Sequence, residues 1–365
     1  MSLPMSSSPV RVAIAGLGDA GFAMHLPALS SLSGAVVVGV CDHSEERQKR
    51  AAGKWKVAVF ADAADMIAAC SPELLIVATP PGTHADLCIM GLEAGANVLC
   101  EKPFVQTLDE ADRVLDASAR TGRRVALNHE FREMPIFKAI LDAARARDAG
   151  ELAFAQAWQL MYMPPWEEHG WRGEMERRTL HEAGVHLIDF LIALFGELPH
   201  AVSGTMSSGG MREGESDAVC VVTLEFSRGR IAQLIQNRLC KGETHYFEVR
   251  ADTTNASFRA SFGGRARVTT GLHRSTIPHL RVDYGVSGIA WREKGPSRTF
   301  LARNPRDPRM VATRSVIEQT LAAFASGMEP PASGADGRGV LRVIDACYAA
   351  AVSGRRTAIE VDDHA

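Results

Sequence analysis

The feature that most constrains this chain is a glycine-rich turn near its start, Gly16-Leu17-Gly18-Asp19-Ala20-Gly21. It follows Val12-Ala13-Ile14-Ala15, an apolar run that favours a buried parallel strand. Gly16 permits a sharp turn out of the strand, Gly18 permits close approach of a pyrophosphate, and Gly21 permits tight packing of the next helix on the sheet. The spacing predicts a dinucleotide site, because the N-terminus of that helix offers free N–H groups to the phosphates.

A second apolar strand, Ala35 to Cys41, ends at Asp42. An acid about twenty residues beyond such a turn binds the ribose hydroxyls, and its charge repels the 2′-phosphate of NADP. We therefore expect NAD as the cofactor. His43, Ser44 and Arg47 follow and offer a phosphate site, so NADP is the alternative. An ordinary glycine loop is the competing interpretation, and the flanking strand and acid argue against it.

Strands and helices alternate up to residue 127, which predicts one doubly wound parallel sheet. Asp62 is expected to cap one helix, and Gly95 and Gly122 to end two others. The further strands are expected at 57–60, 74–78, 97–100 and 125–127, and the helices at 44–53, 63–70, 85–94 and 108–121.

Beyond residue 128 the pattern changes to strand-like runs joined by short turns, which predicts a large, mostly antiparallel open sheet. Residues 253–309 lack clear periodicity and are expected in sheet edges and loops. The expected strands are 154–162, 218–226, 231–238, 246–250 and 357–361, and the expected helices 136–146, 179–195, 310–326 and 339–351. The chain is thus an α/β protein with a Rossmann domain at 1–128 and an α+β domain at 129–365, whose C-terminal helices return to the Rossmann domain.

Composition narrows the class of partner. The 365 residues carry a net charge of −3, which argues against nucleic acid or an anionic membrane surface as the main partner. The first nine residues do not resemble a signal peptide, and no run is long and apolar enough to span a bilayer. The seven cysteines form no C-x-x-C pair, so we expect reduced thiols and a cytoplasmic protein.

Two loops follow predicted strands of the first sheet, Thr79-Pro80-Pro81-Gly82-Thr83-His84 and Glu101-Lys102-Pro103. Ligands of open α/β sheets bind at the carboxyl ends of the strands, so both loops are expected beside the nicotinamide. Lys102 can stabilise negative charge that develops on a substrate oxygen. A solvated surface lysine is the alternative.

A second group, Glu182, His186 and Asp189, has helical spacing that puts all three side chains on one face. Oxidation of an alcohol needs a group that removes the hydroxyl proton, and histidine titrates near neutral pH. Two other interpretations are a buried His186–Asp189 core pair and a metal site, which the absence of a clear histidine cluster disfavours.

Taken together these motifs resemble the Gfo/Idh/MocA family of glucose-fructose oxidoreductase and inositol dehydrogenase. They are Gly16-x-Gly18-x-x-Gly21, Thr79-Pro80-Pro81-x-x-His84, Glu101-Lys102-Pro103, Arg132-x-x-Pro135 and Gly184-x-His186-x-x-Asp189. The resemblance implies NAD(P)-dependent oxidation or reduction of sugars, cyclitols and related polyols, and a homodimer or homotetramer formed through the C-terminal sheet. It also implies that Lys102 binds the reacting hydroxyl and the nicotinamide ribose, and that His186 is the acid/base.

The same resemblance implies that Thr79, Pro80, His84 and Glu101 lie beside the cofactor and that the bond into Pro103 is cis. The family often has aspartate four residues before the histidine, and this chain has Glu182 there, so its substrate contact is expected to shift. Upstream, Trp166, His169, Trp171 and Arg172 are expected on the substrate side, where Arg172 suits a carboxylate or a hydroxyl pair. The alternative is that the tryptophans cap the sheet.

Two other functions remain open at this stage. One is a non-catalytic NAD-binding sensor or co-repressor, which the presence of both Lys102 and His186 disfavours. The other is a redox-neutral, NAD-dependent glycoside hydrolase.

Overall fold

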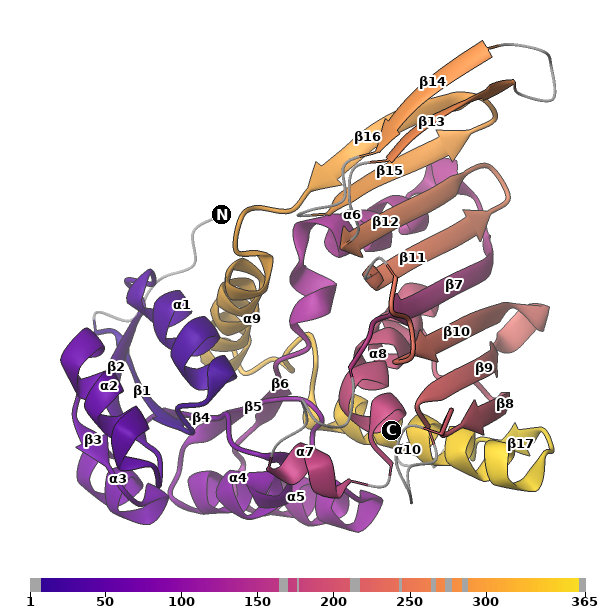
Figure 1. The fold of residues 1–365 in the computed structure, drawn as a ribbon. Coiled ribbons are helices and arrows are strands. Elements are labelled where there is room, and N and C mark those ends of the chain that lie inside the picture. Colours follow the sequence, from indigo (N-terminus) through magenta and orange to yellow (C-terminus); the bar gives the residue numbers. More distant parts are fainter. Residues whose placement is uncertain are drawn as a thin grey trace. The chain divides into compact units, whose positions relative to one another are not determined.

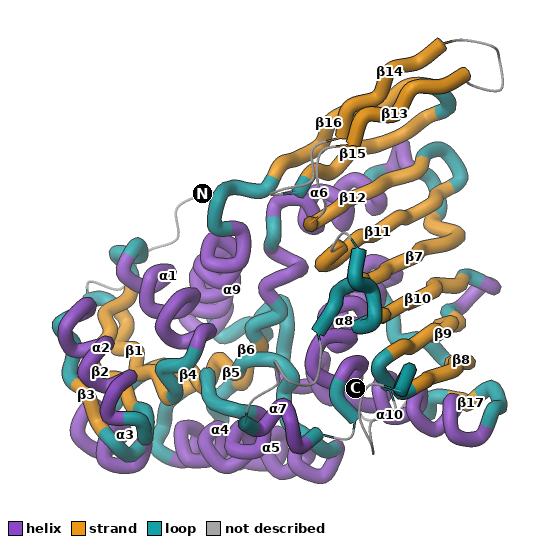
Figure 2. The backbone as a smooth tube through the Cα atoms, in the orientation of Figure 1, coloured by secondary structure: helices purple, strands orange, loops and turns teal. Residues whose placement is uncertain are grey.

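The computed structural model describes residues 8–163, 170–175, 177–210, 217–242, 245–263, 267–272, 278–283 and 288–360. The chain divides into two compact units, Met1–Glu133 with Arg309–Leu341, and Met134–Pro308 with Arg342–Ala365. Each unit contains its own large sheet, and Figures 1 and 2 label the elements.

The first unit contains the predicted parallel sheet. Its described strands are β1 (Val10–Ala15), β2 (Ala35–Cys41), β3 (Val59–Phe60), β4 (Leu74–Val77), β5 (Asn97–Cys100) and β6 (Val125–Leu127). All neighbours pair in parallel, in the order β3-β2-β1-β4-β5-β6. This is the strand order of a Rossmann dinucleotide-binding sheet, so the predicted fold class is confirmed for this half.

Helices cover both faces of this sheet because alternate strand residues point to opposite sides. Ala13 and Ala15 pack in a core with α3 (Ala63–Cys70), α4 (His84–Glu93) and α5 (Leu108–Thr121). Val12 and Ile14 pack in the other core. Its helices are α1 (Leu26–Ser30), α2 (Glu45–Trp55) and α9 (Pro308–Ala325), the last contributing Val316 and Ile317 from a distant part of the sequence.

Local signals fix several helix ends as predicted. The Asp62 carboxylate accepts hydrogen bonds from the backbone N–H groups of Ala64 at 2.7 Å and Asp65 at 3.2 Å, which caps α3. Gly122 adopts the left-handed region with φ of 67° and ends α5.

The second unit contains the large open sheet, whose strand order within the described residues is β16-β15-β12-β11-β7-β10-β9-β8-β17. Neighbours are antiparallel except β7 and β10, so the predicted mostly antiparallel sheet is confirmed. The strands are β7 (Leu152–Leu160), β8 (Ala201–Ser207), β9 (Val219–Glu225), β10 (Ile231–Asn237), β11 (His245–Thr253), β12 (Ser257–Gly263), β15 (Ile289–Lys294), β16 (Ser297–Arg303) and β17 (Thr357–Ala358).

Helices α6 (Pro135–Arg145) and α8 (Val185–Phe195) pack on one face of this sheet, as Figure 1 shows. The short α7 (Trp171–Glu174) and the long α10 (Gly334–Ser353) complete the described α-helices, and β13 (Arg267–Leu272) pairs with β14 (Pro278–Asp283) in a separate ribbon. Within the described residues, no helix has the length and apolarity needed to cross a membrane. All seven cysteines are free thiols.

One expectation for this half was wrong. Residues 253–309 contain the internal strands β12 and β15 and not only edges and loops. On β12, Phe258 and Ala260 are buried while Arg259 lies on the opposite face and pairs with Glu248, so the charged residues obscured the pattern. The helix expected at 179–195 is present, with a π-helical first part, η6 (Thr179–Gly184), that continues as α8.

Candidate active site

The three glycines of the first turn have different surroundings. Gly16 has φ of 98°, and a Cβ there would lie 2.4 Å from the carbonyl oxygen of Ala78. A Cβ on Gly21 would lie 2.0 Å from the carbonyl oxygen of Gly16. A Cβ on Gly18 would meet no described atom within 4 Å. The protein itself thus requires the outer two glycines, whereas the middle one leaves open space where a dinucleotide would approach the backbone.

Asp42, directly after β2, lies beside this turn. Its Oδ2 accepts a hydrogen bond from the Leu17 N–H at 2.8 Å, and its Oδ1 accepts one from the Ser44 N–H at 2.9 Å. Burial acts to raise the pKa of this carboxyl, but these hydrogen bonds and the charge of Arg47, 3.4 Å away, hold the pKa below its ordinary value. A carboxylate is therefore fixed at the place expected for a ribose-binding acid. His43 is 89% exposed beside it, with its Nδ1 3.7 Å from Oδ1.

Asp19 and Ala20 begin the helical segment after the turn, with Asp19 exposed and Ala20 half-buried. The segment continues as the π-helical η1 (Gly21–His25). These residues and Asp42 lie at the carboxyl ends of β1 and β2, the edge where the sequence predicts the cofactor.

The loop after β4 is joined to the loop after β5 through His84. This ring is fully buried, with Nε2 2.8 Å from the Thr79 carbonyl oxygen and Nδ1 3.0 Å from those of Pro103 and Phe104. Burial lowers the pKa of His84 despite these carbonyl groups, which act to raise it. His84 thus holds the loop that carries Lys102, while Thr79 is half-buried and Pro80 exposed at the surface of the same edge.

Lys102 follows Glu101, whose side chain is buried and hydrogen-bonded. Glu101 Oε1 lies 2.8 Å from His25 Nε2 and accepts a hydrogen bond from Asn128 Nδ2 at 2.7 Å, and Oε2 accepts one from the Lys102 N–H at 3.2 Å. Burial acts to raise the pKa of Glu101, but the His25 and Asn128 contacts and the charge of Lys102 lower it. Lys102 is half-buried, and its bond to Pro103 is cis, as expected.

A second buried acid, Glu130, follows β6 in the same region and was not predicted. It is 3% exposed, and its Oε2 has no hydrogen-bond partner among the described residues. Burial, together with the charge of Glu101, raises the pKa of Glu130 to about 8 although the charge of Lys102 opposes this. The sequence could have indicated Glu130 as a site residue, because it lies three residues after the strand predicted at 125–127.

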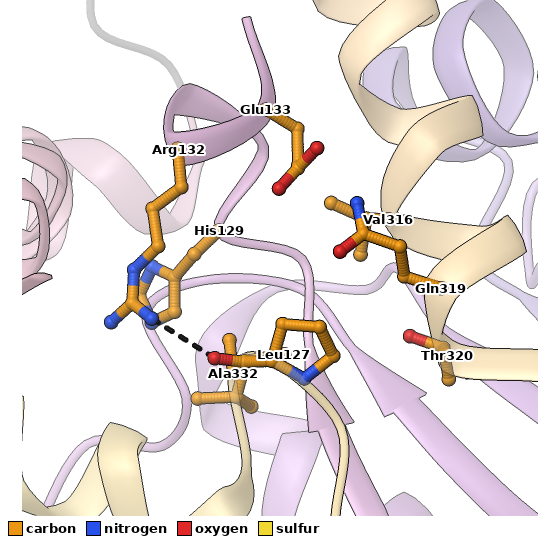
Figure 3. A pocket seen from close by; sticks show the side chains of 9 residues that line it. Leu127, His129, Arg132, Glu133, Val316, Gln319, Thr320 and Ala332 are labelled. Atoms are coloured by element: carbon orange, nitrogen blue, oxygen red, sulfur yellow. Dashed lines mark hydrogen bonds between the residues drawn. The ribbon is translucent and has the colours of Figure 1, made fainter. Parts of the chain in front are cut away.

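A pocket with about 280 Å³ of empty space, part of it open to solvent, adjoins the end of β6. Figure 3 shows Arg132 beside His129 on one wall, and Gln319 and Thr320 from α9 on another. Arg132 Nη1 donates a hydrogen bond to the Pro331 carbonyl oxygen at 3.1 Å. This hydrogen bond ties the arginine of the Arg132-x-x-Pro135 motif to the segment before α10, and none of the predicted catalytic, cofactor-binding or substrate-binding residues lines the pocket.

In the second unit, the predicted His186 and Asp189 lie on α8 and are 3% and 1% exposed. The π-helical η6 directly precedes them. Gly184, at the junction, is closely packed, since a Cβ there would lie 2.5 Å from Gln236 Oε1 and 2.6 Å from Leu180 Cδ1. Single π-helical turns are frequent at functional sites.

Glu182, on η6, contacts two arginines that the sequence did not place beside it. Its Oε1 accepts a hydrogen bond from Arg172 Nε at 2.5 Å, and its Oε2 one from Arg178 Nε at 3.4 Å. The Arg172 guanidinium lies 4.5 Å from the centre of the Trp171 ring. Trp166 and His169 lie outside the described residues. No group of three or more potential metal ligands occurs within the described part of the chain.

Comparison with known proteins agrees with this architecture. Residues 10–129 match a family model described as an oxidoreductase family with an NAD-binding Rossmann fold, and residues 137–258 match the GFO/IDH/MocA C-terminal domain.

Two curated relatives and one solved structure resemble nearly the whole chain. D-apiose dehydrogenase from Paraburkholderia graminis is 24% identical, over 91% of this chain and 85% of that protein. Inositol 2-dehydrogenase 4 from Saccharopolyspora erythraea is 27% identical, over 98% of each. An oxidoreductase from Agrobacterium radiobacter, solved with NAD+, L-tartaric acid and magnesium, superposes with a TM-score of 0.82 at 17% identity, covering 96% of this chain and 99% of that one.

Proposed function

The chain belongs to the Gfo/Idh/MocA family of NAD-binding oxidoreductases, and from this we propose that it transfers a hydride between nicotinamide C4 and a hydroxyl-bearing carbon of a sugar, cyclitol or related polyol. The observation that carries the proposal is the convergence of the open space at Gly18, the ionised Asp42 and the anchored Lys102 loop at the carboxyl edge of one sheet. The dehydrogenase names of the two curated relatives support it.

The proposed role of each residue follows from the chemistry of its side chain. When bound, NAD supplies the carbon that accepts the hydride. Asp42 binds the adenosine ribose, and Lys102 binds the reacting hydroxyl and stabilises the charge that develops on its oxygen. His186 takes the hydroxyl proton in oxidation and returns it in reduction. Trp171, Arg172 and Asp189 contribute to the substrate side.

We also propose residues 1–128 as the cofactor-binding domain and residues 129–365 as the substrate-binding and assembly domain of a homodimer or homotetramer. The free thiols support a reducing, cytoplasmic location. The sensor and glycoside hydrolase alternatives gain no support from the relatives.

The test is reduction of NAD, and separately of NADP, by the purified protein with a panel of sugars, cyclitols and sugar acids, followed by nicotinamide absorbance. His186→Gln and Lys102→Met should each lower kcat by about 100-fold or more while NAD still binds. Tm and NAD affinity, measured on each variant, separate loss of chemistry from loss of fold. Unchanged turnover in either variant would remove that residue from the mechanism, and an aglycone released without net NADH would instead indicate the hydrolase.

A further inference from the structure

The carboxylate of Glu182 joins one buried arginine and one accessible arginine. Its side chain is 15% exposed, that of Arg178 is 2% exposed and that of Arg172 is 45% exposed. Each oxygen of the carboxylate accepts a hydrogen bond from the Nε of one arginine. Glu182 therefore holds Arg172 in place, which is a different task from binding a neutral substrate hydroxyl.

The guanidinium of Arg172 is held at its Nε by Glu182 and along one face by the Trp171 ring. The edge that carries the two Nη atoms belongs to a side chain that is 45% exposed. Glu182 holds Nε, and Trp171 lies against the face with its ring centre 4.5 Å from Cζ. Among the described residues, none accepts a hydrogen bond from either Nη atom. Two parallel N–H groups are thus presented with little remaining rotational freedom, and this fork matches the two oxygens of a carboxylate.

The position of this group along the chain places it close to the proposed acid/base. Glu182 stands four residues before His186, the proposed acid/base, on the continuous run formed by η6 and α8.

We propose that the substrate is a polyhydroxylated carboxylic acid, such as an aldonic or uronic acid, whose carboxylate binds the Nη atoms of Arg172, with Glu182 as the positioning residue. The inference rests on the function proposed above and names the substrate class. It also gives the replacement of the family's usual aspartate by glutamate a physical role, because the longer side chain reaches an arginine.

The test compares acids with neutral partners of the same skeleton, D-gluconate with D-gluconamide and D-galacturonate with D-galactose. The wild-type protein should use the acid of each pair with a kcat/KM about 10- to 100-fold higher, the range expected for a hydrogen bond to a charged group. Arg172→Met should abolish this preference by raising KM for the acids, with little change for the neutral compounds. Added guanidinium ion should partly restore use of the acids.

Two further variants isolate the role of Glu182. Glu182→Gln should raise KM for the acids more than it lowers kcat, and a loss that is equal for acids and neutral partners would show a merely structural role. Arg177→Met is the matched control, since this exposed arginine lies near Asp345 at 3.8 Å and does not contact Glu182 among the described residues. It should leave the preference unchanged.

Failure of this inference differs from failure of the proposed function. Equal use of acids and neutral partners would overturn the carboxylate assignment and leave the dehydrogenase in place. Absence of NAD reduction by all four compounds and by the wider panel would overturn both.

Discussion

At the scale of single residues, two buried acids of the first unit have opposite protonation behaviour. Glu101 is stabilised as a carboxylate by His25 and Asn128. Burial, with the charge of Glu101, raises the pKa of Glu130 to about 8. An unfolded glutamate loses its proton near pH 4.3. Between pH 4.3 and about pH 8, the folded protein therefore binds more protons than the unfolded chain.

This difference predicts a pH-dependent stability. The contribution of Glu130 to the free energy of unfolding is fully present below about pH 4. It is lost as the pH rises towards 8, at up to about 1.4 kcal/mol per pH unit. The Glu130→Gln variant cannot ionise at this position. Its free energy of unfolding minus that of the wild type should therefore increase by a few kcal/mol between pH 5 and pH 8. Urea unfolding at several pH values measures this.

The exposed Glu46 provides the control, and Glu46→Gln should follow the wild-type curve at every pH. Parallel curves for Glu130→Gln and the wild type would show that Glu130 is already ionised in the folded protein.

At the scale of elements, what could be predicted depended on how far apart the interacting residues are in the sequence. The Asp62 cap and the end of α5 each depend on neighbouring residues, and both were predicted. The contacts of Glu101 with His25 and Asn128 span 76 and 27 positions, so no local pattern reveals them. The helical run at 179–195 was predicted, but its spacing did not indicate that Thr179–Gly184 is π-helical.

In the first βα turn, a single variant can separate an effect on stability from an effect on NAD affinity. Gly18→Ala introduces a Cβ with no described atom within 4 Å, so the stability of the protein should be unchanged or increased by about 0.5 kcal/mol. The same methyl group occupies the space proposed for the pyrophosphate, and the Kd for NAD should rise about tenfold or more, as measured by calorimetric titration.

Gly21→Ala is the opposite case. Its Cβ would lie 2.0 Å from the Gly16 carbonyl oxygen, so this variant should lose about 1–3 kcal/mol of stability. If Gly18→Ala bound NAD with wild-type affinity, the dinucleotide could not approach the turn as proposed.

At the scale of the whole molecule, the large sheet has a covered face and an open face. Ala232 and Leu234 are fully buried, and α8 packs on their strand. On the opposite face Ile235 of β10 pairs with Trp158 of β7 and with Val221 of β9, which forms an apolar row across three strands. Val221 and Ile231 are 39% and 41% exposed. A polar row of Gln156, Gln233 and Thr223 lies between that row and Ile231. Partly exposed apolar side chains on an uncovered sheet face suit a protein–protein interface, which supports the proposed homo-oligomer.

The proposed assembly predicts that charges on this face will separate the subunits. Two buried carboxylates per chain would lack partners in the interface, so Val221→Glu combined with Ile231→Glu should reduce the molar mass, measured by light scattering after size exclusion, from two or four chains to one. The free energy of unfolding of each chain should change little, because both positions already face away from the core. Val36→Glu, at a residue 42% exposed on β2 in the other unit, is the matched control and should keep the wild-type mass. A wild-type protein that is monomeric at micromolar concentration, or a double variant that keeps the oligomeric mass, would show that the subunits do not meet through this face.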